Sequence, residues 1–162
     1  MKQCKNCQVN KTLKPKKKAH MEITSTANHP FDKCYLDIVG PLPPSATGNR
    51  YILAFQDDLS KYVVATPISQ QDAETVAMVF VSQVVLKYGK PSIVQTDQDA
   101  NFVSEMFKNT CKFLKIKKIQ STVFQPESQG SIERSHLVLA EYLQHYVKED
   151  QTNWDELVPF AA

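Results

Sequence analysis

The sequence Ser92-Ile-Val-Gln-Thr-Asp97 lies between two segments with helical spacing of apolar residues, and this arrangement decides the fold class. Residues 92–96 form a short apolar run typical of a strand, and the run ends at an acid. Residues 73–88 before it and 102–114 after it each place apolar side chains on one helical face. Strands joined by helical crossovers pair in parallel, so this part of the chain predicts a parallel sheet covered by helices.

The rest of the chain extends this sheet on both sides. Upstream, residues 34–39, 51–55 and 62–66 read as three strands joined by short turns, which predicts an antiparallel meander. Downstream, residues 118–124 read as a fifth strand, followed by a loop at Gln125–Gly130 and a helix over 131–147. The order βββαβαβα predicts an α/β fold, with a five-stranded mixed sheet and helices on both faces.

Three acids stand where this fold would place chemistry. Asp37 alternates with apolar neighbours in the first strand, and an unpaired buried charge is costly, so it should face a polar cleft. Asp97 ends the fourth strand, at the sheet edge where open α/β sheets bind ligands. Glu133 lies early in the last long helix, and 35 residues separate it from Asp97. Three carboxylates from separate segments are typical of an Mg²⁺ site.

This spacing and its surroundings resemble the D,D-35-E signature of retroviral and LTR-retrotransposon integrase catalytic cores, most closely those of the Ty3/gypsy class. Three blocks and one turn carry the resemblance, in the order of the family: Tyr35-Leu-Asp-Ile-Val-Gly-Pro-Leu42, Asp58-Leu-Ser-Lys61, Thr96-Asp-Gln-Asp-Ala-Asn-Phe102 and Gln125-Pro-Glu-Ser-Gln-Gly-Ser-Ile-Glu133. The resemblance covers essentially the whole chain. It implies an RNase H-like fold, with Asp37, Asp97 and Glu133 as catalytic metal ligands.

The resemblance also implies an activity, cofactors and partners. The expected activity is metal-dependent 3′-end processing and DNA strand transfer, with two Mg²⁺ (or Mn²⁺) ions per active site when DNA is bound. The expected partners are double-stranded DNA, as element ends and target, and further copies of this chain. Gln129, Gly130 and Arg134 are candidate DNA contacts, and Tyr142, Tyr146 and Trp154 are candidate interface aromatics. Such an enzyme would act in the nucleus after a cytoplasmic particle stage.

The first 27 residues differ from the rest. Cys4 and Cys7 form half of a zinc site, followed by a lysine run, so residues 1–27 read as the remnant of a zinc-binding domain plus a basic linker. A structural zinc ion needs four ligands, and we expect none bound in this chain. Residues 28–162 would then be the catalytic core, truncated at its C-terminal end. Against the family pattern, Asp99 stands where glycine is usual, and we expect it to face solvent.

Other interpretations remain open. Taken singly, each acid also fits an ordinary turn, cap or surface residue. The whole chain also fits a domesticated, catalytically silent module that binds DNA or protein, or a nuclease of the same fold. The composition agrees with one packed domain and an appendage: 162 residues, 42% hydrophobic, net charge +2, without a membrane span or secretory leader. Lysines cluster at 11–18 and 112–118, and the second cluster fits DNA binding and simple solubility equally.

Overall fold

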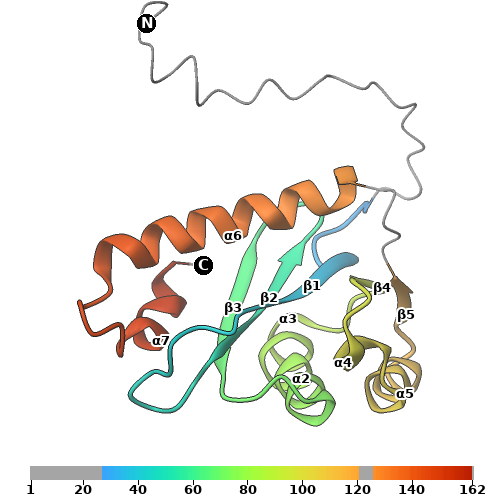
Figure 1. Cartoon of the computed structure of the whole chain (residues 1–162). Coiled ribbons are helices and arrows are strands. Elements are labelled where there is room, and N and C mark those ends of the chain that lie inside the picture. Colours follow the sequence, from blue (N-terminus) through green and yellow to red (C-terminus); the bar gives the residue numbers. More distant parts are fainter. Residues whose placement is uncertain (1–26, 121–125, 162) are drawn as a thin grey trace, which may run out of the picture.

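A five-stranded mixed sheet forms the centre of the computed structural model, which describes residues 27–120 and 126–161 (Figure 1). Within these ranges the side chains of residues 126–131 and 133 are not described. The strand order is β3-β2-β1-β4-β5. The first three strands are antiparallel, whereas β4 pairs in parallel with both β1 and β5. The bounds are β1 Lys33–Val39, β2 Tyr51–Asp57, β3 Val63–Ile68, β4 Ile93–Thr96 and β5 Lys117–Gln120.

Helices cover both faces of this sheet, as the sequence predicts. One face packs against the continuous helix made of α2 (Ala73–Val79), the π-helical η1 (Phe80–Val85) and α3 (Leu86–Tyr88). The short helices α4 (Ala100–Val103) and α5 (Glu105–Phe113) lie on the same side (Figure 1). Their shared core includes four fully buried phenylalanines, Phe55, Phe80, Phe102 and Phe107. Burying such rings removes large apolar areas from water and holds this layer in place.

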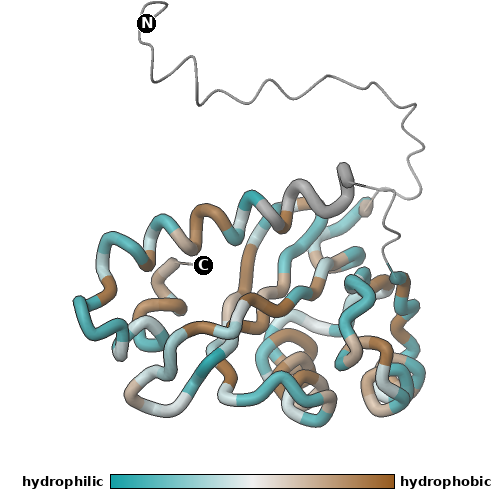
Figure 2. The backbone as a smooth tube through the Cα atoms, viewed as in Figure 1, coloured by the Kyte–Doolittle hydropathy of each residue, from teal (hydrophilic) through white to brown (hydrophobic). Residues whose placement is uncertain are grey.

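The opposite face is covered by the long helix α6 (Pro126–Tyr146), with α7 (Trp154–Leu157) and the 3₁₀ helix η2 (Val158–Phe160) beside it, where η2 contacts β3 (Figure 1). Leu139 of α6 packs with Ile52, Ala65, Trp154 and Val158 in a second, smaller core. Figure 2 shows hydrophobic and hydrophilic residues alternating along α6, as expected of a helix with one side on a sheet. This packing fixes α6 across β1. No helix in the described ranges is long and apolar enough to cross a membrane.

The C-terminal segment is tied to the connection between β1 and β2. Asp155 is buried, and its carboxylate accepts hydrogen bonds from the side chains of Ser45, Thr47 and Asn49. Trp154 donates its indole N–H to the carbonyl oxygen of Pro43 at 2.8 Å and is only 3% exposed. The expectation that Trp154 supplies interface surface is therefore wrong, because the ring fills the second core. The described surface does retain Tyr146, which is 61% exposed.

Several element boundaries differ from the sequence predictions for local reasons. The helix expected over 102–114 begins two residues earlier and is broken at Ser104, whose backbone is extended. The Ser104 hydroxyl oxygen caps α5 by accepting a hydrogen bond from the Phe107 amide. The third strand includes Pro67, which is tolerated because β3 is the edge strand. The expected fifth strand reached residue 124, but residues 121–124 lie outside the described part. Residues 1–26, including Cys4 and Cys7, lie outside it too.

Candidate active site

Asp37 and Asp97 are brought together by the pairing of β1 with β4. The last parallel pair of this ladder joins Leu36 to Thr96, and each strand continues with one of the two acids. Neighbouring strands lie about 5 Å apart, and residues in register project to the same face of a sheet. The register therefore sets the two aspartates side by side on the α6 face, at the carboxyl end of β4.

Local hydrogen bonds of ordinary length fix the backbone around both acids. One Asp37 carboxylate oxygen accepts the amide of Ile38 at 2.8 Å, and Asp97 Oδ1 accepts the amide of Asp99 at 3.0 Å. The Thr96 hydroxyl donates to the Asp97 carbonyl oxygen at 3.1 Å. Both aspartates are half-buried, so their carboxylates combine a fixed backbone with access to solvent.

Helix α6 crosses above Asp37. Nδ1 of His136 lies 3.8 Å from Oδ2 of Asp37, and the two side chains are 22% and 30% exposed. Glu133 belongs to the same helix, three residues before His136. Residues three apart lie on the same side of a helix, so the Glu133 backbone lies one turn from the point where α6 meets Asp37. The Glu133 side chain is outside the described set, and its convergence with the two aspartates stays a prediction.

The donor chemistry of the site fits a hard divalent cation. Asp37 and Asp97 offer carboxylate oxygens at a partly exposed sheet edge, and Mg²⁺ prefers oxygen ligands from a few carboxylates. Among the described side chains no group of three or more potential ligands gathers in one place. The pair of aspartates is therefore the described part of the predicted triad, and a third carboxylate would have to come from elsewhere.

The candidate DNA contacts lie near the start of α6. The sequence predicts a loop over Gln125–Gly130, but the helix already begins at Pro126, so the loop prediction is wrong for 126–130. Proline suits the first turn of a helix because its backbone has no N–H to leave unpaired, which explains the earlier start. Gln129 and Gly130 are thus helical, and nothing is described of their surroundings. Arg134 is exposed, as a contact to a bound partner requires.

Asp99 has a structural role that the sequence analysis missed. It is the N-cap of α4, and its carboxylate accepts bonds from the amide and the side-chain amide of Asn101, at 2.9 and 2.7 Å. The side chain is half-buried, so the expectation of a purely solvent-facing residue is wrong. The N-cap preference of aspartate was the available signal, since Asp99 directly precedes Ala100 and its apolar helix.

The contact between His136 and Asp37 was also missed. From the sequence alone, His136 falls on the apolar stripe of the last helix with Ile132 and Leu139, and this position favours a core or interface histidine. The available signal was its spacing from Glu133: a polar residue one turn after a predicted ligand shares the side of the helix that faces the site.

Similarity to known proteins agrees with this geometry. The model of the family described as "Integrase core domain" matches residues 27–126. The chain is 42% identical, over 135 residues, to the retrovirus-related Pol polyprotein from transposon 412 of Drosophila melanogaster. It is 30% identical, over 130 residues, to the Pro-Pol polyprotein of simian foamy virus type 3. These alignments cover 83% and 80% of this chain, and the chain spans 11% of the length of each polyprotein.

Solved structures show the same fold. The HTLV-2 integrase catalytic core domain in complex with magnesium superposes with a TM-score of 0.68 at 18% identity, over 84% of this chain and 85% of that one. For the catalytic core domain of BIV integrase the TM-score is 0.63 at 23% identity, over 81% and 82% of the two chains. A simian T-cell lymphotropic virus intasome chain gives 0.72 at 20% identity, over 97% and 56%.

The sheet order and the helices on both faces define an RNase H-like fold, the fold of these integrase catalytic cores. The chain belongs to the integrase core domain family, a family of polynucleotidyl transferases found in Pol polyproteins.

Proposed function

We propose that this chain is the catalytic core of an enzyme that processes the 3′ ends of element DNA and joins them to target DNA. The observation that carries the proposal is the register of β1 and β4, which sets Asp37 beside Asp97 below the helix that carries Glu133. Membership of the integrase core domain family supports the same reaction class. The finer chemistry rests on the motif resemblance described above.

Asp37, Asp97 and Glu133 are the residues that would hold divalent metal. Two Mg²⁺ ions, or Mn²⁺ ions in their place, would supply activation of the attacking oxygen and stabilisation of the leaving oxygen at phosphorus. The β-sheet register and the local hydrogen bonds of Asp37 and Asp97 hold their backbones in place before DNA arrives. Such preorganisation lowers the reorganisation needed during the reaction.

The reaction would proceed without a covalent link to the protein. In 3′-end processing, water attacks a phosphorus atom near the end of the element strand, and the bond to the leaving 3′ oxygen breaks. In strand transfer, the resulting 3′-hydroxyl attacks a phosphorus atom of the target, and one phosphodiester bond replaces another. Arg134 is exposed on α6 one residue after Glu133, where its guanidinium is available to bind a DNA phosphate.

The proposal includes partners and a place of action. Double-stranded DNA would be the substrate twice, as element end and as target. Two ends must be joined together, so we propose that the core works as a homo-oligomer. The HTLV-2 core is described in trimeric and dimeric forms, which supports the proposal by similarity. The chromosomal target implies action in the nucleus.

A joining assay tests the proposed function. The whole chain is incubated with duplexes that carry the terminal sequences of its own element and with plasmid target, in Mg²⁺, in Mn²⁺ and with a chelator. The proposal predicts joined products with either metal and none with the chelator. A protein that binds the duplexes tightly, yet yields no product with either metal, would instead be the silent DNA-binding module that the sequence left open.

A further inference from the structure

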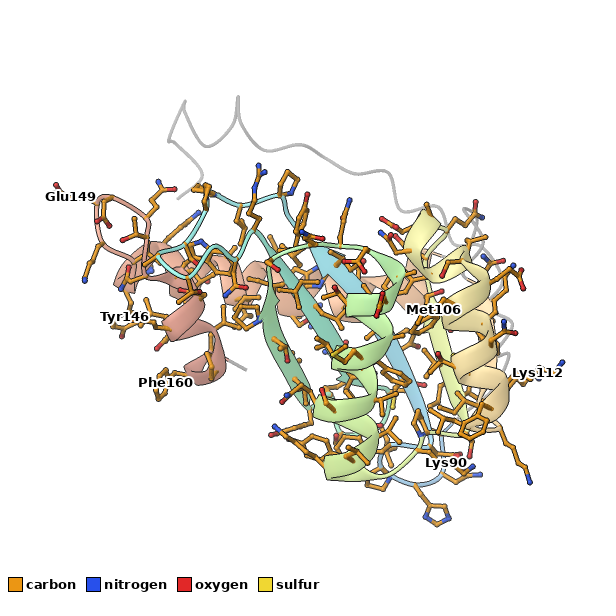
Figure 3. The ribbon with its side chains drawn as sticks, turned by 90° about the horizontal axis from the view of Figure 1, so that it is seen from below. Lys90, Met106, Lys112, Tyr146, Glu149 and Phe160 are labelled. Atoms are coloured by element: carbon orange, nitrogen blue, oxygen red, sulfur yellow. The ribbon has the colours of Figure 1, made fainter. Side chains whose placement is uncertain are left out.

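A second group of charged side chains lies near the amino ends of β4 and β5. The candidate active site lies at the other, carboxyl end of β4. Lys90 precedes β4, Lys117 begins β5, and Lys112 and Lys115 lie at the end of α5. All four are exposed, and they are named here the amino-edge lysines. Figure 3 shows Lys90 and Lys112 at the end of the molecule away from Glu149 and Phe160.

Backbone contacts join the segments that carry these lysines. Ile93 is the parallel partner of Lys117, and the Lys117 amide donates to the carbonyl oxygen of Ser92 at 2.8 Å. The segment that follows Lys90 therefore runs beside the segment that opens β5. The amide of Lys115 donates to the carbonyl oxygen of Lys112 at 3.0 Å, which keeps these two on one turn. The lysines come from three segments that meet at one edge.

The charge of this edge is not neutralised within the described part of the chain. The described salt bridges join Glu105 to Lys108, Asp58 to Lys33 and Lys61, and His136 to Asp37, and none involves an amino-edge lysine. Asp32 borders the edge, where its backbone carbonyl oxygen accepts the amides of Ser92 and Ile93. Four positive charges beside one acid repel one another in the isolated protein and favour a polyanion as partner.

The geometry points to duplex DNA as that partner. Side chains alternate between the two faces along a strand, so residues 93, 95 and 97 share one face of the sheet. Lys117 lies on that face too, because it pairs with Ile93. Four residues of a strand span about 13 Å, so Lys117 and Asp97 are separated by about that distance along the sheet. This distance corresponds to roughly four base pairs of a duplex. Lys90, Lys112 and Lys115 belong to the segments of α3 and α5 on the other side of the sheet, so the charged surface continues from Lys117 around this end of the sheet. DNA presents about one phosphate charge per 1.7 Å of its length, which suits charges spread over such a surface better than a compact anion would.

We propose that the amino-edge lysines bind the phosphate backbone of a DNA segment that continues beyond the active site. The proposal rests on the proposed function only for the identity of the polyanion. The contact is independent of sequence, because lysine binds phosphate as a point charge and reads no base edge. Its role is to add affinity and to orient the duplex, without touching the reacting phosphorus.

The test compares two variants of the whole chain with equal loss of charge. The first carries Lys90→Gln, Lys112→Gln and Lys117→Gln; Lys115 is kept, so that each variant loses three positive charges. The control carries Arg50→Gln, Lys61→Gln and Lys148→Gln, three exposed positions elsewhere. Fluorescence anisotropy with a labelled duplex of about 30 base pairs, in chelator and between about 50 and 200 mM salt, gives the affinity of each protein.

The amino-edge variant should bind at least about tenfold more weakly, and its slope of log affinity against log salt should fall by about three. The control should lose less than one unit of slope. Equal slopes and affinities for the two variants would overturn the proposal and leave an acidic protein as the partner for this edge. The binding measurement needs no metal and no reaction, so it is independent of the joining assay. If the chain joins no DNA but the amino-edge variant still shows the predicted change of salt slope, only the proposed function is contradicted.

Discussion

Leu36 and Thr96 form the last parallel pair between β1 and β4, and the residue after each of them is an acid. This pair makes neighbours of two residues that are 60 positions apart in the chain. Asp37 and Asp97 should therefore act as one unit. A crystal soaked in Mn²⁺ should show anomalous density between their carboxylates, and an ordered site with the two carboxyl groups more than about 10 Å apart would end the two-metal account.

Substitution of either aspartate should abolish joining and preserve the fold. An asparagine keeps the shape of Asp37 or Asp97 but is a far poorer Mg²⁺ ligand, so Asp37→Asn and Asp97→Asn should each lower the joining rate more than about a hundredfold. Thermal melting should change little. Glu105→Gln is the matched control, because Glu105 is an 80% exposed acid on α5 that pairs only with Lys108 in the described structure. A large loss in the control as well would indicate a general charge effect.

The contact between His136 and Asp37 should tune metal use more than stability. Replacing His136 with Ala removes a neighbour 3.8 Å from the carboxylate and leaves Asp37 less restrained. We expect the Mg²⁺ concentration for half-maximal joining to rise by about tenfold, at the lower end of the losses seen when a residue that supports a metal ligand is removed. Leu137→Ala, at an exposed position next in sequence, should leave that concentration unchanged. Equal effects of the two changes would assign His136 to packing alone.

Asp155 should make the stability of the fold depend on pH. Burial opposes its ionisation, but hydrogen bonds from the side chains of Ser45, Thr47 and Asn49 outweigh that effect and lower the pKa of Asp155 from its ordinary value of 3.8. The contribution is present above pH 3.8 and is lost as the pH falls through the lower folded-state pKa. Asp155→Asn should cost about 1–3 kcal/mol of unfolding free energy near neutral pH.

The loss of unfolding free energy caused by Asp155→Asn should become smaller as the pH is lowered below 3.8. Urea unfolding at several pH values measures it, with Glu156→Gln as the control at the exposed neighbouring acid. A deficit that stays constant through the acid range would show that the charge of Asp155 adds nothing.

Asp99 should matter to helix α4 and little to catalysis. Glycine is itself an acceptable N-cap, so Asp99→Gly should cost only a few tenths of a kcal/mol, whereas Asp99→Ala should cost about 1 kcal/mol. Both variants keep the backbone amide that donates to Asp97 Oδ1, so joining should change less than about threefold. A gain of a hundredfold or more for Asp99→Gly would show instead that the acid cripples this copy of the enzyme.

The sequence predicted most of the fold because its signals are local. The helical spacing over residues 73–88 and the apolar run 92–96 that ends at Asp97 predict a helix and a strand, and the structure confirms both. Boundaries set by one residue were missed: Ser104 breaks a continuous apolar pattern through its own cap, and Pro126 starts a helix where a loop was expected.

The site was predictable in part. The sequence predicted that Asp37 and Asp97 belong to one site, whereas the register that pairs Leu36 with Thr96 comes from the structure. The burial of Asp155 was not foreseen, because its partners Ser45, Thr47 and Asn49 lie more than a hundred positions away. The interface prediction for Trp154 was wrong for the same reason. Its indole N–H donates to the carbonyl oxygen of Pro43, which is distant in the sequence, and its ring lies in the second core.

The most direct test of the central claim is the joining rate of Glu133→Gln, measured with Mg²⁺ beside its melting temperature and its affinity for duplex DNA. Glu133 lies on the helix that crosses Asp37, and the account requires its carboxylate to complete the metal site. The predicted result is a loss of joining of more than about a hundredfold, with melting and DNA affinity close to those of the unsubstituted chain. Joining at the unsubstituted rate by a well-folded Glu133→Gln protein would contradict the account.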